Sequence, residues 1–147
     1  MGPELIRRVC GQIDETRLDE PSHEGRFSPR EVVAHLADWE PIFLARIRQS
    51  VERPDSELEV FDEGEMALAH SYAQADIEQE LRKYASHRRA SVEYLRSLAD
   101  ADWQKSSRHP ERGILTVREQ AFTEIGHDMY HAEQLSGYFK PKDVASW

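Results

Sequence analysis

The sequence predicts an all-α protein folded as a four-helix bundle in up-down-down-up order. Four long segments repeat apolar residues every three or four positions, which is typical of amphipathic helices, and no segment shows the alternation of a strand. A short link suffices between antiparallel neighbours, whereas the roughly 25 residues between the second and third segments can cross the end of the bundle. An ordinary loop with decorations would fit the same length. At 147 residues the chain has the length of one domain, so we expect a single domain over residues 1–147.

The first two helices are indicated by apolar spacing and by a strong helix start. Apolar residues recur every fourth position at Leu5, Val9 and Ile13, which predicts a first helix over about residues 3–18. The sequence SPRE, beginning at Ser28, offers a capping residue, a proline at the first helical position and a glutamate that closes a capping box. It predicts a second helix over about residues 29–49, in which Pro41 is expected to kink or loosen one turn.

The third and fourth helices follow the long connection, which carries a short helix near residues 65–71. We expect the third helix over about residues 76–99 and the fourth over about residues 117–139, where the sequence TVRE forms a second capping box. The segment WQKSSRHPERG between them is expected to be a loop, because it is rich in serine, proline and glycine. The sequence Lys140-Pro141 ends the fourth helix.

The composition excludes several classes of function. With 19 basic and 28 acidic residues the net charge is −9, which disfavours nucleic acid binding because a phosphate backbone requires a concentrated basic surface. The basic clusters Arg46 to Arg48 and His87 to Arg89 lie inside helical patterns and are expected to be solvated. A lone cysteine, Cys10, excludes an internal disulfide framework and a cysteine-rich zinc site. No stretch resembles a membrane span or a signal peptide, so we expect a soluble, cytoplasmic protein without a membrane partner.

Three of the seven histidines form a candidate metal site. His127 and His131 lie four residues apart on the fourth helix, about 40° around its axis and about 6 Å along it, so two imidazoles can converge on one ion. His35 follows the apolar row near the start of the second helix. In the crossover topology these two helices are antiparallel. His35, about 10 Å from the start of its helix, and His131, about 12 Å from the end of its own, then lie near the same end of the bundle.

Three imidazole ligands with a free position are typical of a catalytic metal site. Neutral imidazole suits zinc, nickel, iron and copper, and such an ion lowers the pKa of a bound water or activates a thiolate. Histidines four residues apart also occur on ordinary helices, so the spacing by itself leaves a surface or core role open for them.

The segments SPREVVAHLADWE and LTVREQAFTEIGHDMYHAEQL make the chain resemble the DinB/YfiT-like superfamily of metal-dependent enzymes, and the helix pattern extends the resemblance over about residues 3–140. In that family one histidine on the second helix and an H-x-x-x-H pair on the fourth bind a divalent metal. These positions correspond here to His35, His127 and His131. The resemblance implies an up-down-down-up bundle, often a dimer, with the metal in a pocket at one end. Some members resemble transferases that use a low-molecular-weight thiol, and others look like hydrolases.

These observations favour a metal-dependent enzyme that acts on a small-molecule substrate, with zinc or nickel held by the three histidines. A thiol-dependent S-transferase with a low-molecular-weight thiol as co-substrate is the first choice, because the resemblance points there, and a metal-dependent hydrolase is the alternative. A non-catalytic module that binds metal or a ligand in a stress response, and a metal-free bundle that acts by dimerising, are further alternatives. We expect a homodimer on the resemblance alone.

Two carboxylates are candidates for catalytic proton transfer. Asp38 lies about one turn beyond His35 and Glu124 lies three residues before His127, so either can hold an imidazole tautomer or accept a proton from a bound thiol or water. An ordinary solvated carboxylate explains each of them equally well, because acidic residues occur on every predicted helix.

Other neighbours of the histidines have weaker predicted roles. Gln134, three residues after His131, is a further candidate for orienting a ligand, while Trp39 is expected to pack and Tyr130 to face away from the metal. The loop histidine His109 either reaches the mouth of the pocket or faces water.

Overall fold

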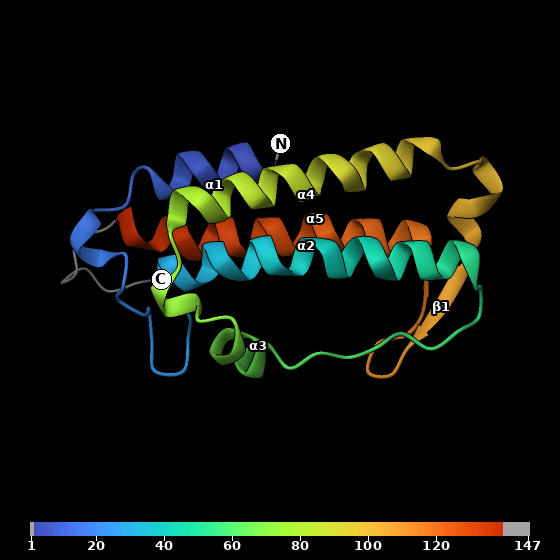
Figure 1. Cartoon of the computed structure of the whole chain (residues 1–147), viewed down its shortest axis with the longest axis horizontal. Coiled ribbons are helices and arrows are strands. Elements are labelled where there is room, and N and C mark those ends of the chain that lie inside the picture. Colours follow the sequence, from blue (N-terminus) through green and yellow to red (C-terminus); the bar gives the residue numbers. More distant parts are fainter. Residues whose placement is uncertain (1, 140–147) are drawn as a thin grey trace.

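The computed structural model describes residues 2–139 and confirms the four-helix bundle. The bundle is made of α1 (Gly2–Cys10), α2 (Pro29–Glu52), α4 (Ile77–Ser97) and α5 (Val117–Ser136). In Figure 1, α2 and α4 run in one direction while α1 and α5 run in the other, which is the predicted up-down-down-up order. The long connection between α2 and α4 therefore crosses from one end of the bundle to the other.

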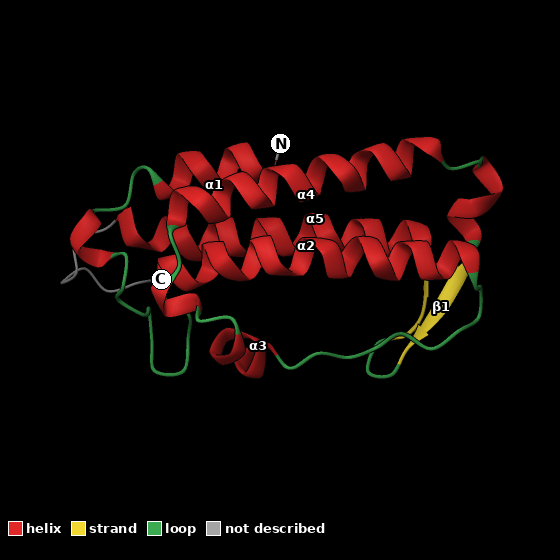
Figure 2. Cartoon of the chain, in the orientation of Figure 1, coloured by secondary structure: helices red, strands yellow, loops and turns green. Residues whose placement is uncertain are grey.

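The crossover, residues 53–76, returns along the outside of the bundle (Figure 1). It carries the short helix α3 (Glu63–Ala69), close to the position predicted for it, and the 3-10 turn η2 (Tyr72–Gln74). Figure 2 shows that much of the remaining crossover is loop, so its path depends on contacts with the bundle.

Both predicted capping boxes are present and explain where α2 and α5 begin. Ser28 accepts a hydrogen bond from the backbone of Glu31, whose carboxylate accepts one from the backbone of Ser28 at 2.8 Å. Thr116 and Glu119 make the same reciprocal pair at the start of α5. α2 continues through Pro41 to Glu52, and α5 ends at Ser136 with the 3-10 turn η4 (Gly137–Phe139) after it. Lys140 and Pro141 lie outside the described residues.

The prediction of a first helix over residues 3–18 is wrong, because α1 ends at Cys10. Gly11 follows, and Asp14 accepts hydrogen bonds from the backbone and hydroxyl of Thr16, which starts the 3-10 turn η1 (Glu15–Arg17) instead of a longer helix. Short polar side chains compete with helical hydrogen bonds in this way. Ile13 is nevertheless buried, so the apolar spacing indicated packing correctly beyond the end of the helix.

The expectation that the chain has no strand is also wrong. The segment WQKSSRHPERG, residues 103–113, was expected to be a loop. It contains the end of the 3-10 turn η3 (Asp100–Gln104) and most of an antiparallel hairpin, made of β1 (Ser106–His109) and β2 (Gly113–Thr116). Strands of four residues are too short to show alternation, and Gly113 adopts a φ of 81° that suits glycine in the tight connection. The crossover extends the pairing, since the backbone of Arg108 accepts from Leu58 and donates to Ser56.

The apolar core lies between the four helices and contains residues from each of them. α2 packs against α4 and α5, and α1 packs against α5 and α4. The core residues are Ile6, Cys10, Ile13, Val32, Val33, Leu36, Ala37, Leu81, Tyr84, Ala132, Leu135 and Tyr138. Within residues 2–139, none of the helices is long and apolar enough to cross a membrane.

Candidate metal centre

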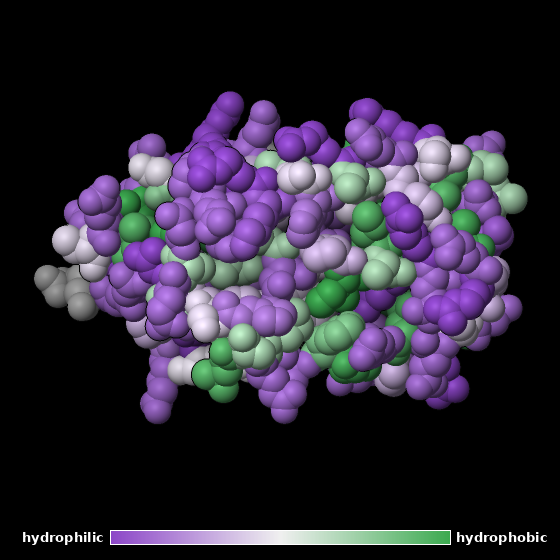
Figure 3. All heavy atoms as spheres, in the orientation of Figure 1, coloured by the Kyte–Doolittle hydropathy of each residue, from purple (hydrophilic) through white to green (hydrophobic). Residues whose placement is uncertain are grey.

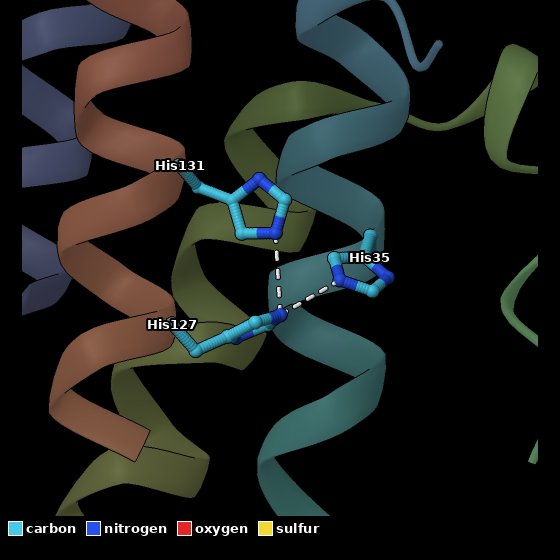
Figure 4. A group of neighbouring side chains, drawn as sticks. All are labelled: His35, His127 and His131. Carbon is cyan, nitrogen blue, oxygen red and sulfur yellow. Dashed lines mark hydrogen bonds between the residues drawn. The ribbon is translucent and has the colours of Figure 1, made fainter. Parts of the chain in front are cut away.

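The three predicted histidines meet between α2 and α5. Figure 4 shows the imidazole of His35 on α2 pointing toward those of His127 and His131, which project from successive turns of α5. The Nε2 atom of His127 lies 2.8 Å from Nε2 of His35 and 3.2 Å from Nε2 of His131. One nitrogen from each ring lies within 4.8 Å of the other two. The antiparallel packing of α2 and α5 therefore brings together residues 92 positions apart.

These imidazoles are neutral near pH 7. Burial and the neighbouring histidines lower the pKa of His35 to about 2, and burial together with His131 lowers the pKa of His127 to about 3. Burial also lowers the pKa of His131, although its hydrogen bond to Gln134 opposes that effect. A neutral imidazole carries one bare ring nitrogen, so each of the three rings can offer a lone pair to a cation placed between them.

The surrounding side chains hold the rings in this orientation. Nδ1 of His131 lies 2.9 Å from Oε1 of Gln134, so it donates to the amide and leaves Nε2 free to bind an ion. This confirms the predicted contact of Gln134. Phe27 packs against His35 at 5.4 Å between ring centroids, and Phe43 packs edge-on against His127 at 5.3 Å.

The donor set fits a divalent transition metal. Tetrahedral zinc with bonds of about 2.0–2.1 Å separates its nitrogen ligands by roughly 3.3 Å, which the 3.2 Å between His127 and His131 matches, while the 2.8 Å between His127 and His35 is shorter. Nitrogen ligands without a carboxylate suit zinc, nickel, copper or iron and disfavour calcium and magnesium. Among residues 2–139, these three histidines are the group of side chains whose ligand atoms converge in this way.

A cavity of about 530 Å³ opens beside the triad and is lined by His127. Its walls come from α2, the crossover, the hairpin turn and α5. The lining residues are Trp39, Phe43, Arg46, Val60, Phe61, Glu63, His109, Glu111, Arg112, Thr123, Gly126, His127 and Tyr130. Figure 3 shows one face of the molecule, on which hydrophobic and hydrophilic side chains are intermingled.

Tyr130 differs from what the sequence suggested, and two other neighbours of the triad agree with it. Tyr130 was expected to face away from the metal, but its ring packs edge-on against His131 at 5.0 Å and lines the cavity. Trp39 packs as expected and is 8% exposed, yet its indole also forms part of the cavity wall. His109 was expected either to reach the pocket or to face water. It reaches the pocket, because the hairpin places it in the cavity wall.

Asp38 contacts the crossover. Its Oδ2 accepts a hydrogen bond of 2.6 Å from the hydroxyl of Tyr72 and lies 2.6 Å from Nδ1 of His70. The ring of Tyr72 in turn lies 6.4 Å from that of His35. Asp38 thus fastens residues 70–72 against α2 beside the triad, and its catalytic role stays a prediction.

Glu124 lies in a buried cluster of charges behind the triad. Its Oε1 is 2.9 Å from Nε of Arg88, a guanidinium that also binds Glu40 and Asp128. Burial and the negative charge of Glu40 raise the pKa of Glu124 to about 8, so it holds a proton at neutral pH. Its catalytic role is likewise untested by these contacts.

The basic clusters expected to be solvated each contribute one enclosed arginine. Arg88 is 15% exposed and bound by carboxylates, and Arg46 lies over the rings of Trp39 and Phe61 at 5.5 and 5.9 Å. Arg46 continues the helical row of His35, Trp39 and Phe43, and this spacing was a signal for it in the sequence. Arg112 comes from the hairpin turn and Glu63 from the first turn of the short helix α3, and neither continues a helical row that leads to the triad.

The model of the DinB superfamily matches residues 2–135. The chain belongs to the DinB superfamily. Among curated relatives, the "putative metal-dependent hydrolase" of Oceanobacillus iheyensis is 23% identical over 141 residues, which cover 96% of this chain and 81% of that protein. The "putative metal-dependent hydrolase YfiT" of Bacillus subtilis is 22% identical, and the match covers 91% of this chain and 76% of that protein.

Solved structures share the fold. YfiT from Bacillus subtilis, described as a "probable metal-dependent hydrolase with an unusual four-helix bundle topology", superposes with a TM-score of 0.78 at 22% identity, over 94% of this chain and 77% of that one. A mycothiol-dependent maleylpyruvate isomerase gives a TM-score of 0.73 at 12% identity, over 91% of this chain and 56% of the isomerase chain.

Proposed function

We propose that this protein is a metal-dependent enzyme in which His35, His127 and His131 bind one divalent ion, most favourably zinc or nickel. The convergence of their three Nε2 atoms beside an open cavity carries the proposal. A divalent ion held by three neutral imidazoles supplies a Lewis-acidic position at which a thiol or a water molecule loses its proton.

Thiol transfer to an electrophilic small molecule is the reaction we favour. A thiol activated in this way needs no general base from the protein, and among the described residues no carboxylate belongs to the triad. The side chains of this chain then have three tasks: the histidines hold the ion, Gln134 holds the tautomer of His131, and the aromatic walls exclude water. A structural neighbour that is named for its dependence on mycothiol supports the choice.

Hydrolysis is the second candidate, and the names of the curated relatives favour it. Water attack benefits from a base in the cavity, and Glu63 lies in its wall. Burial and the charge of Asp62 raise the pKa of the Glu63 carboxyl, which makes it a better proton acceptor. Glu63→Gln should therefore abolish hydrolysis while leaving thiol transfer largely intact.

The test begins with the metal content of untagged protein by mass spectrometry. We expect about one equivalent of zinc or nickel, lost in His35→Ala and His131→Ala and retained in the control His23→Ala, whose side chain is exposed in a loop. A screen of low-molecular-weight thiols with electrophiles, beside simple esters, then separates the two reactions. Metal absent after reconstitution would refute the proposal, and metal bound without turnover would indicate a non-catalytic module.

We also propose that the chain forms a homodimer through the outer face of α5. Phe122, Ile125 and Met129 form a stripe there, each more than half exposed. An antiparallel second copy centred between Ile125 and Gly126 places Phe122 opposite Met129. The same register pairs Arg118 of one protomer with Glu133 of its partner, both exposed. Apolar contacts and complementary charges therefore coincide in one self-complementary arrangement.

Sedimentation velocity tests the dimer. Ile125→Asp should give monomers, whereas Leu68→Asp, an equally apolar and 84% exposed position on α3, should not. Arg118→Glu should weaken the dimer and the added exchange Glu133→Arg should restore it. A monomeric wild-type protein at the highest measurable concentration would refute this proposal and leave the metal site unaffected.

A further inference from the structure

We propose that the cavity beside the triad accepts a small organic acid, whose carboxylate binds Arg46 and Arg112 and whose apolar body lies against Trp39 and Phe61. This inference deepens the proposed function, because it names the class of substrate that would meet the nucleophile activated at the histidines.

Arg46 makes no direct ion pair with a carboxylate in the described part of the chain, although the charge of Glu59 acts on it. Its Nη2 donates 2.7 Å to the backbone oxygen of Glu59, and its Nε is buried without a partner among the described residues. None of the ion pairs found within residues 2–139 involves Arg46, whereas the other enclosed arginine, Arg88, binds three carboxylates. The remaining N–H groups of Arg46 are donors at the wall of the cavity.

A second cation lies nearby. Arg112 lines the same cavity from the hairpin turn, and together with burial its charge lowers the pKa of Arg46. Both arginines also lower the pKa of His109, so the three groups are close enough to repel one another. Like charges in one wall are unfavourable until an anion lies between them. Two guanidiniums suit a carboxylate because each offers paired donors.

The acidic side chains of the cavity offset this pair only in part. Glu63 and Glu111 belong to the lining, and the charge of Arg112 acts on Glu63, but neither acid makes an ion pair with Arg46 or Arg112 in the described part of the chain. The arginine pair is therefore a local exception on a protein whose net charge is −9.

The position of Arg46 relative to the triad sets the length of the ligand. Trp39 and Phe43 both contact the ring of His127, and Arg46 follows them on the same face of α2. The helical rise places Arg46 roughly 5–10 Å further along the axis. A molecule about one aromatic ring and a short chain in length spans that distance, with its flat part against the indole of Trp39.

Calorimetric titration with 3-phenylpropionate and its neutral amide tests the proposal on the metal-loaded protein. We expect the acid to bind wild type about 10–100-fold more tightly than the amide, the range for hydrogen bonds to a charged group. Arg46→Met and Arg112→Gln should each reduce this preference, and Arg46→Lys should retain part of it. Arg48→Gln is the matched control, because Arg48 belongs to the same basic cluster but is exposed and stacks on Tyr94.

The same titration of the His127→Ala variant separates this proposal from the proposed function. The preference for the acid should persist there without metal, since Arg46 and Arg112 lie outside the triad. A preference that disappears with the metal would show that the acid binds the ion and would overturn the assignment to Arg46. Equal binding of acid and amide, or a preference that survives both arginine variants with folding checked by circular dichroism, would overturn it as well.

Discussion

Replacing Glu124 with glutamine should change how the stability of this protein depends on pH. Arg88 is one cation shared by three buried carboxyl groups, those of Glu40, Glu124 and Asp128, which are 2%, 5% and 4% exposed. The hydroxyl of Tyr84 also donates to Asp128. The cluster carries excess negative charge if every acid ionises, so burial and Glu40 keep a proton on Glu124.

The magnitude follows from linkage. The pKa of Glu124 is raised from 4.5 in the unfolded chain to about 8 in the folded one. Between these values the folded state binds one more proton, so its contribution to stability is complete below pH 4.5 and is lost as the pH rises toward 8. The free energy of unfolding then falls by about 1.4 kcal/mol per pH unit. The Glu124→Gln variant binds no such proton. Between pH 5.5 and pH 7.5 its free energy of unfolding should therefore rise by on the order of 2–3 kcal/mol relative to that of wild type.

Urea unfolding of metal-free wild-type and variant protein at half-unit steps of pH measures this difference. The three histidines contribute with the opposite sign: their pKa values are lowered, so their contribution is lost as the pH falls below about 6.5. That contribution is common to both proteins and cancels in the difference. Parallel curves with equal m-values would refute the reasoning, because they would mean that Glu124 is ionised in the folded protein at neutral pH.

Four further outcomes are expected. Arg88→Met leaves the carboxyl groups of the cluster buried without their cation. It should lower the free energy of unfolding, measured by urea unfolding, by about 3–5 kcal/mol. A loss smaller than that of Arg88→Lys would count against the role of the cluster. Gln134→Leu removes the acceptor for His131 and should weaken zinc binding about 10–100-fold in competition with a chromogenic chelator; unchanged affinity would deny its orienting role. Zinc at 100 times its Kd should stabilise wild type by about 2.7 kcal/mol in calorimetry and leave His35→Ala unmoved. Ser28→Ala should cost about 1 kcal/mol through loss of the cap, and a neutral result would contradict the capping box.

The helices and the histidine triad were predictable because their signals are local. Capping boxes at Ser28 and Thr116 involve residues three positions apart, and the spacing of His127 and His131 places both on one helical face whatever surrounds them. The length of the crossover then indicated that α2 and α5 are antiparallel, which brought His35 to the same level.

The errors lie where local signals compete or are too short. The apolar spacing through Ile13 led us to predict a first helix that is too long. The helix ends at Cys10, and Asp14 then binds Thr16 and starts a separate turn. The hairpin of residues 106–116 is stabilised by pairing with the crossover, a contact about 50 residues away in sequence that no window of neighbouring residues contains.

By itself, the sequence determined four helices, their order and the three residues that meet as a candidate metal centre. Only the tertiary structure decided that Arg46 faces a cavity, that Arg112 joins it from the hairpin, and that Arg88 gathers three carboxylates around one cation. Helical periodicity and capping depend on bonds and spacings within a few residues. Burial, pKa and the charge of a cavity wall depend on which distant segments pack together, and those contacts exist only in the folded chain.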